Sequence, residues 1–74
     1  MKMFRIHRKY LINKIKHLEK MKTNLENILE NIHNGLNNNY IDITTTLKFN
    51  DAIYDFYEES MEIIREICEL YQNK

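Results

Sequence analysis

Proline is absent from this chain of 74 residues, and glycine and cysteine occur once each. Cys68 has no second cysteine to pair with, so an internal disulfide is excluded. The three histidines match no zinc-binding spacing, and a zinc site normally takes four ligands. We therefore expect no bound metal and no other cofactor.

Long hydrophobic runs are also missing. No stretch approaches the ~18 apolar residues of a membrane span, and the first residues lack the uncharged apolar core of a secretory signal. We expect a cytoplasmic protein with no membrane partner, in which a free cysteine is ordinary. The abundance of Ile, Asn and Lys is typical of AT-rich coding, as in a low-GC bacterium or a phage.

A chain of this length forms one domain, residues 1–74, with a small core. Such a core tends to contribute only about 3 to 5 kcal/mol, so small domains usually need a disulfide, a metal or a partner. Because the first two are not expected here, oligomerisation or complex formation remains.

The net charge is zero, but the two signs are segregated along the chain. Residues 1–22 hold eight basic residues and one acidic residue, and residues 42–74 hold eight acidic and three basic residues. Such asymmetry is typical of a nucleic-acid-binding arm or an acidic mimic, and equally of two helices that attract each other.

The first half carries apolar residues alternately three and four positions apart, which predicts a long helix over residues 3–34. The expected seam comprises Leu11, Ile15, Leu18, Leu25, Leu29, Ile32 and Leu36. Lys22 fills the one remaining seam position, where its stem can pack while its ammonium reaches water. Met21 and Ile28 widen this seam on one side.

Gly35 follows the last periodic turn, where glycine commonly ends a helix in the left-handed conformation. The asparagines of residues 37–39 are turn formers. We expect an ordered connector over residues 35–45, with Tyr40, Ile41 or Ile43 covering the end of the core. The N-cap candidates for a second helix are Thr44, Thr45, Thr46 and Asn50.

The second helix is expected over residues 46–72 and carries three stripes. The first apolar stripe comprises Phe49, Ile53, Phe56, Ser60, Ile63, Ile67 and Leu70. A second, uncharged stripe comprises Tyr54, Tyr57, Met61, Ile64, Cys68 and Tyr71. On the other side runs an acidic stripe of Asp55, Glu59, Glu62, Glu66 and Glu69.

The two apolar stripes of this helix span about half of its circumference or more, whereas one neighbouring helix covers an arc of about 100°. The connector could fold over the second stripe, but ten residues shield only one or two turns. Tyr and Met are enriched in interface cores, and exposed apolar strips mark contact sites. We therefore predict that the second stripe, Tyr54 to Tyr71, binds a partner.

The charged residues have two interpretations each. The acidic stripe is either a docking surface for a basic target or a solvated face that pairs with the basic first helix. The candidate nucleic-acid contacts are Lys2, Arg5, Lys9, Lys16 and Lys20. Against nucleic-acid binding, most such domains carry a basic excess, and this chain is neutral overall.

Catalysis is not expected. Paired carboxylates such as Glu59 and Glu62 would need a concave, partly dry pocket to shift their pKa values, which two helices alone do not offer. Cys68 has no histidine within a turn and is expected to behave as a small hydrophobic residue. We expect neither an enzyme nor a small-molecule substrate.

Together these features predict an all-α antiparallel helical hairpin that closes into a four-helix bundle by homodimerisation. The plan resembles that of the small plasmid RNA-regulatory dimers of the Rop kind, in architecture and without a shared motif. The expected function is a non-catalytic protein–protein interaction module, such as a regulator, antidote or inhibitor that binds a protein target stoichiometrically. The alternatives are a nucleic-acid-binding regulator that uses the basic face of the first helix, and an obligate small subunit of a hetero-complex.

Overall fold

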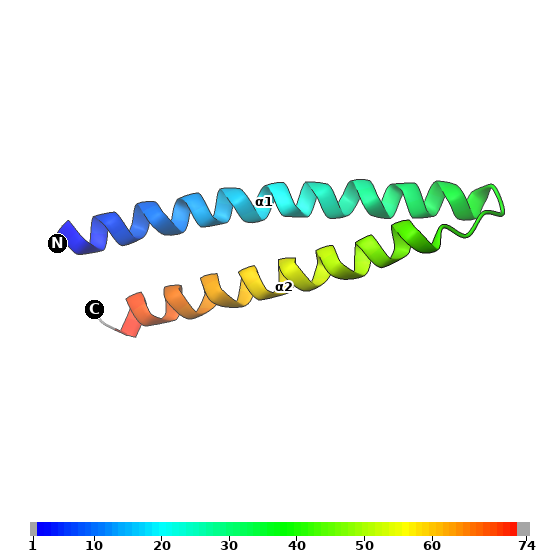
Figure 1. Cartoon of the computed structure of the whole chain (residues 1–74). Helices are drawn as coiled ribbons and strands as arrows, with labels where there is room; N and C mark the ends of the chain where they lie inside the picture. Colours follow the sequence, from blue (N-terminus) through cyan, green and yellow to red (C-terminus); the bar gives the residue numbers. More distant parts are fainter. Residues whose placement is uncertain (1, 73–74) are drawn as a thin grey trace.

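The computed structural model describes the backbone of residues 2–72 and the side chains of residues 7–72. Two helices fill almost all of this range, α1 (Lys2–Asn37) and α2 (Ile43–Gln72), and residues 2–72 contain no strand. They run antiparallel as a hairpin, with the connector at one end (Figure 1). The predicted all-helical hairpin is thus confirmed.

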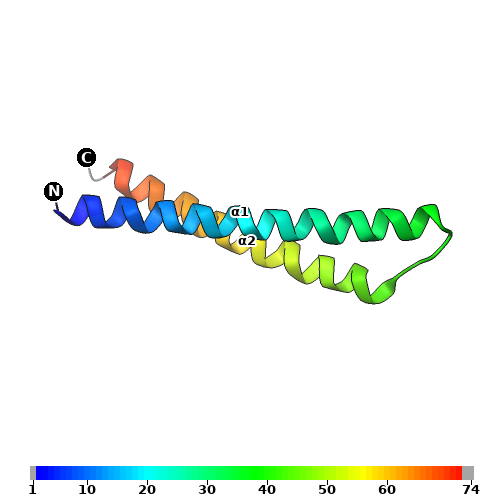
Figure 2. The ribbon, with the colours of Figure 1, turned by 90° about the horizontal axis from the view of Figure 1, so that it is seen from above.

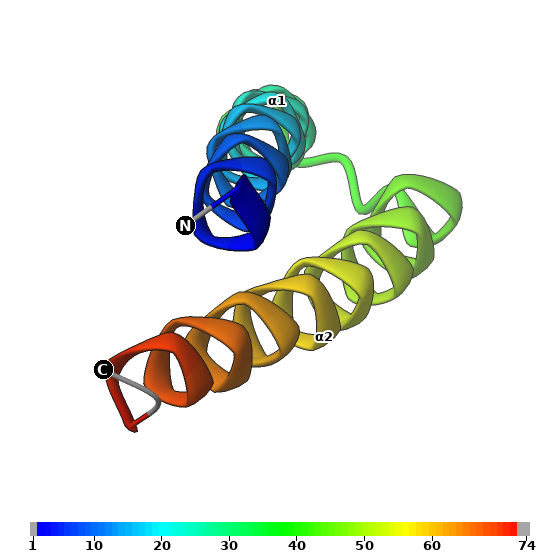
Figure 3. The same cartoon turned by 90° about the vertical axis from the view of Figure 1, so that its left-hand side faces the viewer.

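The hairpin is long and thin, with extents of 57 × 15 × 14 Å and a radius of gyration of 17.0 Å. A compact domain of this length would have a radius of gyration of about 11 Å. The helices cross near their middles in the view from above (Figure 2), and α2 is inclined to α1 in the end view (Figure 3). Two inclined rods cannot enclose a deep core, so much of each helix stays exposed.

α1 ends in a Schellman motif whose left-handed residue is Asn39, with a φ of 59°. The Tyr40 N–H donates to the Gly35 carbonyl at 2.8 Å, and the Asn39 N–H donates to the Leu36 carbonyl at 3.1 Å. This pairing satisfies carbonyls that the end of a helix leaves without partners. The prediction that Gly35 is the left-handed stop is therefore wrong, because Gly35 lies inside α1 and has no positive φ.

Gly35 instead allows Tyr40 to approach the last turn of α1. A Cβ at position 35 would lie 3.2 Å from the Tyr40 carbonyl oxygen and 3.7 Å from its Cδ1. The connector lies between Asn37 and Ile43. It is shorter than the expected 35–45 because α1 continues past Gly35 and α2 begins before residue 46. Tyr40, Ile41 and Ile43 are 61–70% exposed, so the prediction that they cover the end of the core is wrong.

Asp42 is the N-cap of α2. Its Oδ1 accepts from the Thr45 N–H at 3.0 Å, and its Oδ2 accepts from the Thr45 hydroxyl at 2.6 Å. The predicted start at residue 46 with a threonine or Asn50 as cap is wrong, because a carboxylate that accepts both Thr45 donors starts the helix at Ile43. These hydrogen bonds also lower the pKa of Asp42, first through the Thr45 hydroxyl and then through the Thr45 N–H.

The face of α1 that meets α2 differs from the predicted seam. The described side chains that are buried or half-buried along α1 include Leu11, Lys14, Leu18, Met21, Leu25, Ile28 and Ile32. Ile15, Leu29 and Leu36 of the predicted seam are instead 40–56% exposed. Met21 and Ile28 make one flank of the seam apolar, and α1 packs through that side, turned by about 50°, one heptad position.

α2 is turned in a matching way. Its buried or half-buried positions include Phe49, Ala52, Phe56, Glu59, Ile63, Glu66 and Leu70. Ile53 and Ile67 of the predicted first stripe are 44% and 46% exposed. Among the described side chains only Leu11 and Ile63 are fully buried, so the contact between the helices is a thin layer.

Candidate functional site

An apolar surface, here called the composite face, runs along one side of the hairpin. It consists of Ile15, Leu29 and Leu36 from α1 and Ile53 and Ile67 from α2. On each helix these residues follow a buried seam residue by four positions, as Ile15 follows Leu11 and Ile67 follows Ile63. Because the helices are antiparallel, offsets of the same sense place both sets on the same side of the hairpin.

The predicted partner-binding stripe divides into two lines around α2. Residues seven apart share a position, and neighbouring positions differ by about 50°. Tyr57, Ile64 and Tyr71 lie beside Ile53 and Ile67, at the edge of the composite face, and are 63%, 52% and 75% exposed. The structure therefore joins this line to residues of both helices that the sequence assigned to the hairpin core.

The second line points away from α1. It consists of Leu47, Tyr54, Met61 and Cys68 and is called the outer strip below. Tyr54 is 65% exposed, Met61 is 38% exposed, and the Cys68 thiol is free and exposed. By helical position this strip lies about 180° from the contact with α1, so α1 cannot cover it.

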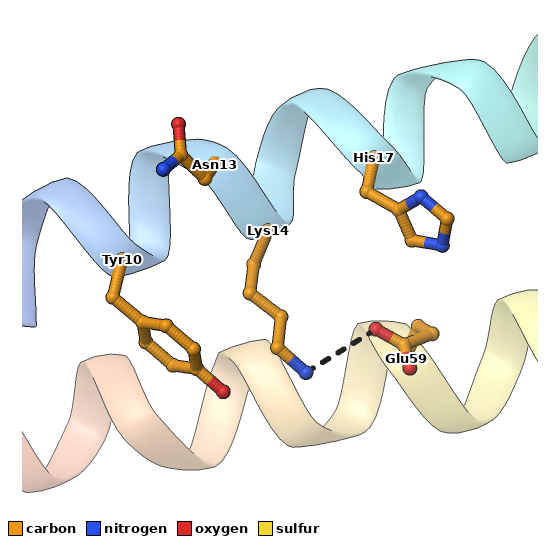
Figure 4. A pocket seen from close by; sticks show the side chains of 5 residues that line it. All are labelled: Tyr10, Asn13, Lys14, His17 and Glu59. Atoms are coloured by element: carbon orange, nitrogen blue, oxygen red, sulfur yellow. Dashed lines mark ion pairs between the residues drawn. The ribbon is translucent and has the colours of Figure 1, made fainter.

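The acidic stripe lies partly inside the contact between the helices. Lys14 Nζ is 3.2 Å from a Glu62 carboxylate oxygen and 3.6 Å from one of Glu59. The same ammonium lies 5.5 Å from the centre of the Tyr10 ring, and Figure 4 shows it between that ring and Glu59. The hydrogen bond to Glu62 is the main cause that raises the pKa of Lys14, so this amine remains a cation at neutral pH.

The rest of the acidic stripe has mixed surroundings. Asp55 and Glu69 are exposed, whereas Glu66 is half-buried beside α1. One Glu66 carboxylate oxygen is buried and accepts no hydrogen bond from the residues that the structure describes. The middle of the stripe, Glu59 to Glu66, is thus half-buried, and its two ends are exposed.

A shallow hollow lies beside the Lys14 ion pairs. It is lined by Tyr10, Asn13, Lys14, His17 and Glu59, has a volume of about 370 Å³ and is open to solvent. Tyr10, Lys14 and His17 point toward α2, whereas Asn13 points away (Figure 4). Its lysine is a paired cation and lacks the free amine that a nucleophile needs.

The basic candidates lie away from the apolar surfaces. Lys9, Lys16 and Lys20 are exposed on the side of α1 that faces away from α2. Lys2 and Arg5 lie outside the side chains that the structure describes. The three described lysines therefore remain accessible whatever covers the composite face.

Two further observations concern the described part of the chain. Its His, Cys, Asp and Glu side chains form no group of three or more that could hold a metal ion. Neither of its helices combines the length and hydropathy that crossing a membrane requires.

The sequence missed the composite face and the role of Lys14. The sequence did contain a signal for the rotation of α1, because the apolar Met21 and Ile28 give this helix a second line that can contact α2. The three-and-four spacing of apolar residues alone does not decide which of two lines on a helix meets the neighbouring helix.

Comparison with known proteins adds no assignment to this geometry, since no family model, no curated protein and no solved structure matches the chain.

Proposed function

We propose that this chain is a non-catalytic protein–protein interaction module that dimerises through the composite face into a four-helix bundle. In this proposal it acts as a small regulator, antidote or inhibitor by binding a protein target stoichiometrically. The observation that carries the proposal is the exposure of Ile15, Leu29, Ile53 and Ile67 on one side of the hairpin. In a four-helix bundle each helix has two neighbours, so its apolar arc points between them, toward the bundle axis.

The surface area of the hairpin supports a second copy as the occupant. The chain exposes 6580 Å². A compact folded monomer of 9.1 kDa would expose about 4,900 Å². A standard protein interface removes about 800 Å² from each partner, so one such contact accounts for roughly half of this excess.

Two polar residues that lie in line with the composite face, Ser60 and Lys22, are compatible with burial. Ser60 lies between Ile53 and Ile67 along α2, and its hydroxyl donates to the Phe56 carbonyl at 2.8 Å, so it needs no donor or acceptor from a partner. Lys22 lies between Ile15 and Leu29 and is exposed, and its stem can pack while its ammonium reaches the rim.

Molar mass in solution tests the proposal. The native chain is expected at twice 9.1 kDa, and a variant with Ile53→Glu and Ile67→Glu at 9.1 kDa. The matched control is Tyr54→Glu with Cys68→Glu, which places the same charges at the same spacing one position further along α2. This control is expected to remain a dimer, because its residues point away from the composite face.

Each other result contradicts a stated part of the proposal. A folded native monomer would exclude the homodimer and favour the hetero-complex subunit. A dimer that survives Ile53→Glu with Ile67→Glu would place the contact on another surface. Loss of the dimer in the control would extend the contact onto the outer strip.

Nucleic-acid binding is the second candidate, favoured by the exposure of Lys9, Lys16 and Lys20 on one side of α1. A four-helix bundle formed through the composite face would leave these lysines accessible. Phosphate contacts weaken steeply and linearly with the logarithm of salt concentration, so duplex RNA and DNA titrated at 50 and 200 mM salt test this candidate. Binding that is absent at both concentrations would exclude it.

A further inference from the structure

The outer strip stays uncovered even if the proposed dimer forms. Its residues Leu47, Tyr54, Met61 and Cys68 lie about 180° from the contact with α1. In a bundle the second neighbour of α2 would lie about 90° from α1, on the composite-face side. Two neighbours therefore leave an apolar line along the outside of each α2.

The composition of this strip suits an adaptable contact. Tyr54 combines a ring with a hydroxyl, and Met61 is a flexible thioether that fills irregular gaps. Apolar side chains in a row along a helix fit the apolar face of another helix, which presents residues at i, i+3, i+4 and i+7.

Acidic residues border the strip on the side away from the composite face. Asp51, Asp55 and Glu58 are exposed along the middle of the strip, between the exposed basic residues Lys48 at its start and Arg65 after Met61. The Lys14 ion pairs involve Glu59 and Glu62 and leave these three carboxylates out. A partner helix would therefore meet an apolar line with negative charge along one edge.

We propose that the outer strip binds an amphipathic helix of the target protein that carries lysine or arginine beside its apolar face. The acidic border selects basic partners and speeds their encounter, while the apolar line supplies most of the contact. This inference rests on the proposed interaction function, but it does not require the homodimer.

Binding of a designed probe tests the inference. The probe is an amidated 18-residue helical peptide of leucine and lysine, with leucine at i, i+3, i+4 and i+7, titrated at 150 mM salt. A second peptide has glutamate in place of every lysine. We expect the lysine peptide to bind the native protein at least tenfold more tightly than the glutamate peptide.

Two pairs of variants locate the site. Tyr54→Ser with Met61→Ser is expected to weaken binding of the lysine peptide at least tenfold while the molar mass stays that of the native protein. Asp51→Lys with Glu58→Lys is also expected to weaken it at least tenfold. The matched control, Glu26→Lys with Glu30→Lys on α1, makes the same charge change away from the strip and is expected to alter binding less than twofold.

The results separate this inference from the proposed dimer. Unchanged peptide affinity in Tyr54→Ser with Met61→Ser would overturn the inference, as would equal binding of both peptides. Loss of the dimer in that variant would also overturn it, because the strip would then belong to the contact between copies. A monomeric native protein that loses peptide binding in the strip variant would support the inference while excluding the dimer.

Discussion

Asn39, and not the only glycine of the chain, carries the left-handed conformation that ends α1. Asparagine tolerates this conformation better than other residues with a Cβ, and Asn38 and Asn39 form the turn that the asparagine run predicts, while Asn37 still belongs to α1. The sequence could not place the stop at position 39, because Gly35 is the stronger signal by residue type. The close approach of Tyr40, which only tertiary geometry reveals, explains the glycine instead.

Replacement of Asn39 by alanine tests this assignment. A residue with a Cβ and no polar side chain is less stable in the left-handed region, so Asn39→Ala is expected to lower the free energy of unfolding by about 1 kcal/mol. Urea denaturation measures this change. Asn38→Ala is the control, since Asn38 has no positive φ, and an equal loss in both variants would contradict the assignment.

The N-cap Asp42 predicts a pH-dependent stability. Asp42→Ala removes the acceptor of the Thr45 donors and is expected to lower Tm by about 5 °C at pH 7. Because folding lowers the pKa of Asp42 below its ordinary 3.8, its contribution is present above that pH and is lost as the pH falls through the folded-state value.

Thermal melts between pH 7 and pH 2 check the sign of this effect. The difference in Tm between the native chain and Asp42→Ala is expected to stay constant at higher pH and to shrink below pH 3.8. Asp42→Asn keeps an acceptor oxygen without the titrating charge, so the difference in Tm between Asp42→Asn and Asp42→Ala should change little with pH. A Tm difference between native and alanine chains that grows on acidification would refute the cap.

For the helices themselves, the spacing of the apolar residues predicted that two antiparallel helices form. It did not predict how each helix is rotated about its own axis. The alternation of three and four positions identifies both helices because a helix with 3.6 residues per turn brings such residues to one face. Rotation depends on which apolar line meets the neighbour, and here Met21, Ile28 and the Lys14 ion pairs occupy the contact. On α2 the contact takes Ala52, Glu59 and Glu66 in place of Ile53 and Ile67, an outcome that apolar spacing does not predict. The composite face therefore became visible only in the structure.

The matching rotation of the helices predicts that α1 contributes to dimerisation as well as α2. Ile15→Glu with Leu29→Glu is expected to give a folded monomer, because both side chains are about half exposed in the hairpin and face the proposed second copy. Circular dichroism checks folding, and sedimentation velocity measures the mass. Lys16→Glu with Glu30→Lys on the outer side of α1 is the control, and a dimer that survives the first variant would restrict the contact to α2.

At the scale of the whole molecule, the long, thin shape of the hairpin leaves it with a small core, which bears on the proposed dimer. A hairpin with only two fully buried side chains among those described has little core of its own, and its longest extent is nearly four times its width. Full burial of an exposed apolar side chain contributes about 1.5 to 3 kcal/mol, and the five residues of the composite face are already about half covered. Their remaining burial could therefore add about as much stability as the hairpin core supplies. Folding and association are then expected to be coupled.

Coupled folding and association predict a melting temperature that depends on protein concentration. For a dimer that dissociates as it unfolds, a tenfold rise in concentration stabilises the native state by about 1.4 kcal/mol, which raises Tm by about 3 to 6 °C. Thermal melts of the native chain at 5, 50 and 500 µM are expected to show this shift. The variant Ile53→Glu with Ile67→Glu should melt at a lower temperature that does not change with concentration, because its unfolding is unimolecular. A native Tm that is constant over this range would show that the hairpin folds without a second copy, and would remove the physical reason for the dimer.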